Sequence, residues 1–326
     1  MRQGRGPAPG LVPAVLAYLA WGCLPVYFKV LSGVPALEVL AHRILWSVVL
    51  LSVAAPLLGR SRTVLEALGP GKRLAILAST CLIAVNWLTY IWAVQAGRVL
   101  EASAGYFVNP LVSVLLGVVF LGERMRRRQV QAILVAALGV LVLVVRLGTV
   151  PWLPFTLALS FGLYGLVRKR AGVDAVGGLL AETALLAPLA LAVALLRERA
   201  GVGAFGHGLG MSLLLAAAGP ITAIPLVLFA MGVQRLRLST VGLLQYLTPT
   251  LQFLLAVGLY REPFGATHAL AFGLIWSALG LYTWDSLRAG QEPPQAGGAL
   301  SGGGPPARPG SARWSGTSKS EGASAS

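Results

Sequence analysis

Ten apolar segments follow one another along most of this chain, and each is about long enough to cross a lipid bilayer. They comprise residues 11–30, 37–58, 74–96, 100–121, 129–146, 151–167, 176–196, 211–231, 239–259 and 264–285. An α-helix satisfies its backbone hydrogen bonds internally, so a run of roughly 20 apolar residues is stable in hydrocarbon as a helix. The polar stretches between the segments are too short to form a soluble domain. The sequence therefore predicts an all-α integral membrane protein with ten transmembrane helices.

Two stretches of the chain repeat the same order of residue types, namely a tyrosine, a proline, an apolar run and a terminal glutamate. When Pro110 is aligned with Pro249, Glu123 coincides with Glu262. This duplication divides the ten segments into two units of five. Because five is odd, the two copies enter the membrane from opposite sides. We therefore expect two inverted five-helix repeats.

The repeats and the ends of the chain give four regions. The first repeat covers residues 11–146 and the second covers residues 151–285, with residues 1–10 as a short N-terminus. Residues 286–326 are rich in Gly, Ser, Pro and Ala, a composition that buries too little apolar surface to offset the entropy of ordering. We predict that this last region is a disordered tail.

The net charge of +15 raises the question of nucleic-acid binding. Most of the basic residues fall in alternate loops, on the inner side if the N-terminus is cytoplasmic. The positive-inside rule then accounts for the charge, so no nucleic-acid partner is expected. We predict a multi-pass protein of the cell inner (plasma) membrane with both termini cytoplasmic.

The second segment carries a dense set of polar residues, and each ionisable group in a span costs about 2.5–3.5 kcal/mol on insertion scales. Glu38, His42 and Trp46 recur at helical spacing on one face, and Arg43 lies one position further round. Arg43 and His42 are candidates for a charged gate or anion contact, and Trp46 for the lining of a binding site. The alternative is an interfacial salt-bridge set that only anchors the helix.

Further polar residues occur within the third, fourth and ninth segments, where they predict a central polar chamber. The candidates for its lining are Asn86, Tyr90, Tyr106, Asn109, Gln245 and Tyr246. Pro110 and Pro249 each remove a backbone hydrogen bond, so they are candidate hinges at equivalent positions of the two repeats. The alternative is ordinary helix packing, in which such side chains bond across helices without a ligand.

Two carboxylates are expected to act mainly in structure, and the role of a third is open. Glu123 and Glu262 end their segments, where capping or pairing with nearby arginines is the favoured interpretation. Glu182 lies well inside the seventh segment and is open to two interpretations, proton coupling or pairing with a cation.

Several motifs of this chain resemble the RarD-type permeases, which belong to the EamA branch of the drug/metabolite transporter superfamily. The resemblance covers about residues 11–285. It is carried by Pro25-Val26-Tyr27-Phe28-Lys29, Ala41-His42-Arg43, Asn86-Trp87, Gly105-Tyr106-Phe107-Val108-Asn109-Pro110, Gly122-Glu123 and Leu244-Gln245-Tyr246. It implies ten helices in two inverted repeats and a plasma-membrane permease, in a family whose label includes chloramphenicol sensitivity or export.

We therefore expect alternating-access transport of small organic solutes or drugs, with the solute and the bilayer as partners. No enzymatic activity, cofactor or metal site is expected. The coupling ion is open, and so is the oligomeric state, with a homodimer as one option. The rival interpretation is a membrane-embedded enzyme or lipid-handling protein that acts on a lipid headgroup. Such an enzyme generally needs a carboxylate pair or a metal site near one interface, and the sequence shows neither.

Overall fold

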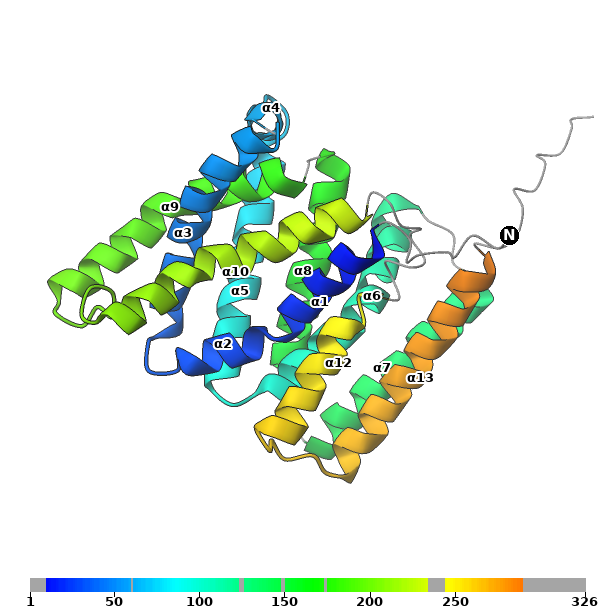
Figure 1. The fold of residues 1–326 in the computed structure, drawn as a ribbon. Coiled ribbons are helices and arrows are strands. Elements are labelled where there is room, and N and C mark those ends of the chain that lie inside the picture. The colour runs from blue at the N-terminus through cyan, green and yellow to red at the C-terminus, as the bar shows by residue number, and fades with distance from the viewer. Residues whose placement is uncertain are drawn as a thin grey trace, which may run out of the picture. The chain divides into compact units, whose positions relative to one another are not determined.

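The computed structural model describes residues 10–59, 61–122, 126–147, 150–172, 175–233 and 244–289, and the regular structure in these ranges is entirely helical (Figure 1). The helices are α1 (Leu11–Gly22), α2 (Leu24–Val30), α3 (Ala36–Leu57), α4 (Ser61–Ala67), α5 (Arg73–Gln95), α6 (Val99–Leu121), α7 (Arg127–Leu147), α8 (Trp152–Ala171), α9 (Ala175–Arg199), α10 (Leu209–Val233), α12 (Leu247–Leu254), the π-helical turn η1 (Leu255–Leu259) and α13 (Ala266–Ala289). The chain divides into two units, residues 1–290 and 291–326, and every described helix belongs to the first. Residues 1–9, Glu123 and the chain from residue 290 onward lie outside the described residues.

Among the residues that the structure describes, six stretches are long and apolar enough to cross a membrane. They are Leu11–Val30, Ala36–Leu57, Arg73–Gln95, Val99–Phe120, Val176–Arg199 and Leu209–Phe229. Their outward faces carry large apolar side chains, such as Val53 and Leu189, which are 59% and 66% exposed. A soluble protein seldom exposes so many such side chains in contiguous patches, whereas lipid solvates them well.

The first expected segment is broken into two helices at Cys23. Pro25 lies at the start of α2, where it has no N–H to donate to the Trp21 carbonyl one turn earlier. Gln252 on α12 donates a hydrogen bond from Nε2 to that carbonyl at 3.3 Å. Thr248, also on α12, donates to the Tyr18 carbonyl at 2.8 Å. The break in the first segment is thus stabilised by side chains from the other end of the chain.

Small residues allow several helices to pack closely. The longest side-by-side pair is α7 with α13, drawn green and orange in Figure 1. An ideal Cβ on Gly139 of α7 would lie 3.0 Å from the Ala271 carbonyl oxygen of α13, and one on Gly105 of α6 would lie 2.9 Å from the Pro154 carbonyl oxygen of α8. Helices also pack in the pairs α3 with α9 and α10, α5 with α8 and α9, α1 with α10 and α12, and α6 with α12. Such small-residue contacts are typical of helix association in membranes.

Glu262 lies between η1 and α13 and caps the N-terminus of α6. Its two carboxylate oxygens accept hydrogen bonds from the backbone N–H groups of Val99 and Leu100, each at 2.7 Å. These N–H groups have no partner within α6, and the positive end of the helix dipole favours the negative charge. Burial raises the pKa of the Glu262 carboxyl above its usual value, and the two N–H donors oppose that shift. The capping role expected for Glu262 is confirmed, although the capped helix is distant in sequence.

Replacing Glu262 by alanine is expected to lower the free energy of unfolding by about 1–2 kcal/mol, because two buried donors at the start of α6 lose their acceptor. Thermal unfolding of the purified protein in detergent measures the effect. Glu66→Ala is the matched control, since Glu66 is exposed and its removal should change stability by less than about 0.5 kcal/mol. Equal midpoints for the two variants would contradict the capping role.

Candidate functional site

The guanidinium of Arg43 lies inside the helix bundle, about two turns from the start of α3. The residue is only 6% exposed. Its Nε donates a hydrogen bond of 2.9 Å to Oγ1 of Thr222 on α10. The hydroxyl of Thr222 in turn donates to the Ala218 carbonyl. Within the described part of the chain no carboxylate is paired with Arg43, so this buried cation is held by one neutral hydroxyl.

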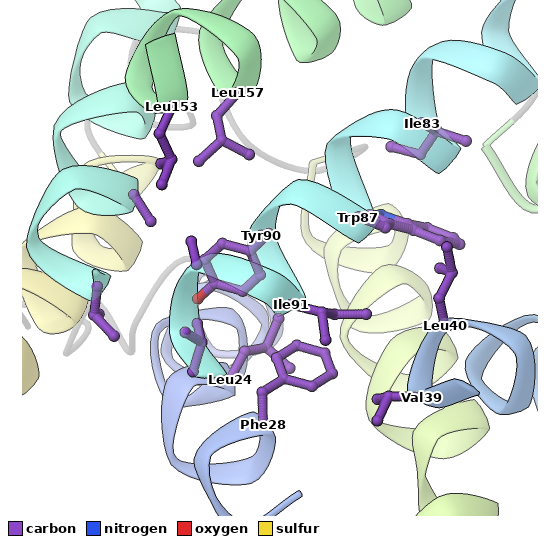
Figure 2. Packing of buried hydrophobic residues seen from close by; sticks show 14 of the residues in the cluster. Leu24, Phe28, Val39, Leu40, Ile83, Trp87, Tyr90, Ile91, Leu153 and Leu157 are labelled. Carbon is purple, nitrogen blue, oxygen red and sulfur yellow. The ribbon is translucent and has the colours of Figure 1, made fainter. Parts of the chain in front are cut away.

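Aromatic side chains surround the guanidinium. Its central carbon lies 4.1 Å from the centroid of the Trp87 ring and 5.7 Å from that of Phe28. Tyr90 packs edge-on against Phe28, with the ring centroids 6.0 Å apart. Figure 2 shows Phe28 of α2 with Trp87 and Tyr90 of α5 in one packed cluster. The faces of these rings partly compensate the charge through cation–π attraction.

Asn86 and Tyr106 extend this cluster toward α8. The Tyr106 ring packs against Tyr90 at 5.5 Å, and its hydroxyl donates to Oδ1 of Asn86 at 3.4 Å. Nδ2 of Asn86 donates to Oγ of Ser160 and to the Leu157 carbonyl, at 2.9 and 3.1 Å. The structure therefore brings together four of the predicted lining residues, Arg43, Asn86, Tyr90 and Tyr106. Asn86 itself is fully engaged in bonds between helices.

Three buried polar atoms near this cluster have no hydrogen-bond partner among the described residues. They are the Tyr90 hydroxyl, the Asn109 Oδ1 and the Ser47 Oγ. Asn109 lies one turn beyond Tyr106 on α6, and Ser47 lies one turn beyond Arg43 on α3. Buried polar atoms are normally paired in native proteins, so these three indicate places where a solute or water completes the structure.

His42 and Trp46 lie on a different face of α3. The His42 ring stacks on Phe205 with the centroids 5.0 Å apart, and Trp46 packs against the same ring at 6.0 Å. Phe205 belongs to the connection between α9 and α10. Adjacent helical positions differ by about 100° in direction, which separates His42 from Arg43. The structure thus places these two predicted site residues away from the aromatic cluster.

Tyr246 is the N-cap residue of α12, and Gln245 immediately precedes it. Tyr246 lines a cavity of about 570 Å³ together with Phe107, Thr250 and Trp276, and none of the residues around Arg43 lines it. Gln245 is partly buried.

The two candidate hinges lie in different parts of their helices. Pro249 is the third residue of α12, in the first turn, where backbone N–H groups have no intrahelical acceptor in any case. Helix α6 runs from Val99 to Leu121 and includes position 110 without a break. The hinge role of both prolines remains a prediction.

A second polar cluster ties together α5, α8 and α9. Glu182 is 0% exposed and forms an ion pair with Arg168 at 3.1 Å. It also accepts hydrogen bonds from Ser79 at 2.7 Å and from Tyr164 at 3.2 Å. Of the two interpretations open for Glu182, the structure shows pairing with a cation.

Glu38 shows the interfacial pairing that the sequence left as the alternative for the second segment. Its carboxylate pairs with Arg197 at the end of α9 and accepts the backbone N–H of Ala204 at 2.6 Å. Glu38 therefore joins the start of α3 to the connection between α9 and α10.

Sequence reasoning missed three residues next to Arg43. Thr222 supplies its acceptor, Phe28 and Trp87 supply ring faces, and none of them is charged. The signal for Thr222 is a hydroxyl between two prolines, Pro220 and Pro225, in an otherwise apolar segment. Nothing in the sequence pairs it with Arg43.

Comparison with known proteins agrees with this architecture. Residues 8–145 match the model of the EamA-like transporter family. An uncharacterized transporter of Vibrio cholerae is 44% identical over 283 residues, which is 86% of this chain and 94% of the relative. The protein RarD of Escherichia coli is 44% identical over 286 residues, or 85% and 95% of the two chains. The chloramphenicol-sensitive protein RarD of Pseudomonas aeruginosa is 34% identical over 285 residues, or 86% and 95%.

A solved crystal structure shares the fold. It aligns with a TM-score of 0.57 and 21% identity, and the match covers 86% of this chain and 98% of the other. Full-length relatives at this identity, the family match and the long apolar helices together identify a multi-pass membrane transporter. The chain belongs to the RarD-type permeases of the EamA transporter family.

Proposed function

We propose that this protein moves a small organic solute across the inner membrane by alternating access, using ten helices in two inverted five-helix repeats. The first repeat is residues 11–146 and the second is residues 151–285. The solute occupies a central chamber next to Arg43, Tyr90, Tyr106 and Asn109.

The pattern of helix packing supports the repeats. If α1 with α2, α3, α5, α6 and α7 correspond in order to α8, α9, α10, α12 and α13, the most extensive contacts between the halves have counterparts, although α4, which packs on α9, has no described equivalent in the second half. The pair α6 and α8 corresponds to α12 and α1, the pair α5 and α8 to α10 and α1, and the pair α3 and α10 to α9 and α5. The pairs α3 with α9, α6 with α12 and α7 with α13 correspond to themselves. Swapping the two halves thus turns each of these helix pairs into another pair that is also in contact. This is expected of two repeats related by a twofold axis in the membrane plane.

The distribution of charge supports the orientation. Basic residues gather in three described connections, around Lys72 before α5, around Arg126 before α7 and around Arg168 at the end of α8. With ten spans these connections lie on one side, which the positive-inside rule makes cytoplasmic. Both termini are then cytoplasmic as well.

The observation that carries the central chamber is a set of buried polar groups whose hydrogen-bonding capacity is wholly or largely unused. Arg43, Tyr90 and Asn109 come from three different helices, and each is at most 6% exposed. In the membrane interior, such groups are stable only beside a partner or a polar cavity. A solute chamber that opens alternately to each side gives all three groups polar contacts.

Thiol accessibility tests this proposal without knowledge of the solute. Asn109→Cys, made in a background with Cys23→Ser and Cys81→Ser, is expected to react with a membrane-impermeant thiol reagent from both faces, in right-side-out and in inverted vesicles. Val49→Cys is the control, because Val49 is 55% exposed on the outer face of α3. A thiol in lipid does not ionise, so position 109 should react at least about tenfold faster than position 49. Reaction from one face only, or equal rates at the two positions, would refute alternating access to this chamber.

A further inference from the structure

Among the buried charges of the described residues, Arg43 is the exception. Glu38 is paired with Arg197 and Glu182 with Arg168, and Asp285 has Arg126 at 3.6 Å, a charge contact without a hydrogen bond to its Oδ2. A buried charge without a partner is strongly destabilising, and this chain avoids that cost at its buried carboxylates. An acceptor for Arg43 is therefore expected from outside the described protein.

Most hydrogen-bonding capacity of this guanidinium is unused. A guanidinium carries five N–H donors in a planar fork and has no acceptor. Only Nε of Arg43 has a hydrogen-bond partner in the described part of the chain, the Thr222 hydroxyl. The two terminal nitrogens therefore present a fork whose geometry matches the two oxygens of a carboxylate.

Other donors stand beside this fork. The Tyr90 hydroxyl is buried without a partner, and the Tyr90 ring packs edge-on against Phe28, whose ring centroid lies 5.7 Å from the central carbon of the guanidinium. Ser47 lies one helical turn from Arg43, and its hydroxyl is likewise unpaired. Hydroxyl groups next to a cation donate readily to an anion. A cationic or amide solute would leave the fork unused or only half used.

The aromatic rings define the rest of the ligand. Trp87 and Phe28 flank the guanidinium, and Tyr106 continues the wall by packing against Tyr90 on one side and Phe161 on the other. Such rings favour a flat or apolar body through offset or edge-on packing.

Cation–π contacts alone do not explain an arginine here. The two contacts together contribute about 1–4 kcal/mol, comparable to the cost of about 2.5–3.5 kcal/mol for a charged arginine at the centre of a transmembrane helix, but ring faces give the terminal N–H donors no oxygen acceptor. A hydrogen bond that links α3 to α10 needs only one donor to Thr222, and a neutral side chain would supply it without the free-energy cost of burying a charge. The unused terminal N–H groups are therefore what distinguishes an anion-binding site from a purely structural contact.

We propose that the transported solute is a small organic carboxylate with an aromatic or otherwise flat apolar body, and that Arg43 binds its carboxylate. The fork of Arg43 donates to the two oxygens, and the Tyr90 hydroxyl donates to one of them. This inference rests on the proposed transport function and adds the class of solute.

Matched acids and amides test the inference. The full-length protein is reconstituted in lipid nanodiscs at pH 7.5, and binding is measured by calorimetry for benzoate and benzamide and for phenylacetate and phenylacetamide. Phenylalanine and its amide form a third pair. Phenylalanine is a zwitterion at this pH, so comparing it with phenylacetate shows whether an added ammonium group changes binding. Chloramphenicol serves as a neutral aromatic solute. Each acid is expected to bind about tenfold or more tightly than its amide, because only the acid engages the charged fork.

Variants locate the effect at Arg43. Arg43→Gln should abolish the preference for acid over amide, and Arg43→Lys should restore part of it, since an ammonium keeps the charge but not the fork. Tyr90→Phe keeps the ring and should weaken acid binding severalfold, with amide binding unchanged. Arg98→Gln is the control, because Arg98 is partly exposed and pairs with Glu101. If Arg43→Gln does not fold, Tyr90→Phe and Arg43→Lys carry the test.

The outcomes separate this inference from the transport proposal. Equal binding of acids and amides by the folded wild-type protein, tighter binding of chloramphenicol than of every acid, or no binding of any acid would overturn the carboxylate assignment. An acid preference retained in Arg43→Gln would overturn the role of Arg43. The transport proposal is tested separately by thiol access to position 109 from both faces, and that measurement does not depend on which solute binds.

Discussion

Replacing Glu182 by leucine is expected to lower the free energy of unfolding by about 3–5 kcal/mol, because it leaves the Arg168 guanidinium buried beside an uncharged partner. Arg168 is 11% exposed at the side chain and Glu182 is fully buried. Tyr164 loses the Glu182 acceptor at the same time, and Ser79 retains only the Ile76 carbonyl. In thermal unfolding in detergent, the midpoint should fall by roughly 10 °C for a chain of this size.

The double variant Glu182→Leu with Arg168→Leu distinguishes a charge effect from a packing effect. Removing both members of a buried ion pair is often neutral or stabilising, so the double variant should recover most of the lost stability. A double variant as unstable as Glu182→Leu alone would mean that shape, and not charge, holds α8 and α9 together. The pair lies outside the proposed solute chamber, so acid binding by the folded double variant should be unchanged.

Replacing Gly219 by alanine is expected to destabilise the protein by about 3 kcal/mol, the upper part of the range for overpacking, because the added methyl group meets rigid backbone. An ideal Cβ on Gly219 of α10 would lie 2.5 Å from the carbonyl oxygen of Trp46 on α3. Neither helix can relieve this contact by rotating a side chain. The two helices must move apart, which also separates Thr222 from Arg43.

A second glycine on the same helix provides the control for Gly219. No atom lies within 4 Å of an ideal Cβ on Gly210. Alanine is the better helix former by about 0.5–1 kcal/mol, so Gly210→Ala should leave stability unchanged or raise it slightly. The two substitutions are chemically identical and are expected to shift the unfolding midpoint in opposite directions. Shifts of the same sign and size would show that α10 does not approach α3 this closely in the folded protein.

Both stability predictions depend on contacts between helices, and they bear on the solute site in different ways. Gly219→Ala should also weaken acid binding, since it disturbs the hydroxyl that holds Nε of Arg43. A row of aromatic rings, from Tyr106 through Phe161 to Tyr164, connects the chamber with the Glu182 and Arg168 pair. Among variants that still fold, Gly219→Ala should therefore bind acids more weakly, whereas the variants at Glu182 and Arg168 should bind them as the wild type does.

Sequence patterns located the helices well because hydropathy is a local property. The expected segments at 74–96 and 100–121 differ from α5 and α6 by at most one residue at each boundary. Local patterns missed the short helix α4, which lies in the polar connection between two apolar segments. They also missed the break at Cys23, because it depends on the contacts that α12 makes with α1. Helix α13 continues to Ala289, beyond the expected end at Asp285.

The candidate site was predicted only in part. Intramembrane polarity marked Arg43, Asn86, Tyr90 and Tyr106, which the fold brings together. The same criterion marked His42 and Trp46, which pack on Phe205, and Tyr246, which lines a different cavity. Polarity within a span shows that a residue needs a partner, but it does not show which partner.

Hydropathy along the chain indicates long apolar helices that cross the membrane and marks the side chains within them that need polar partners. Short motifs identify the family, because they too are local in sequence. The three-dimensional fold was needed to show that Glu182 is neutralised by Arg168, that Glu262 caps α6, and that Arg43 has no carboxylate partner among the described residues. The physical reason is that the partner of a buried group depends on the rotation and close approach of helices distant in sequence, which no local pattern records.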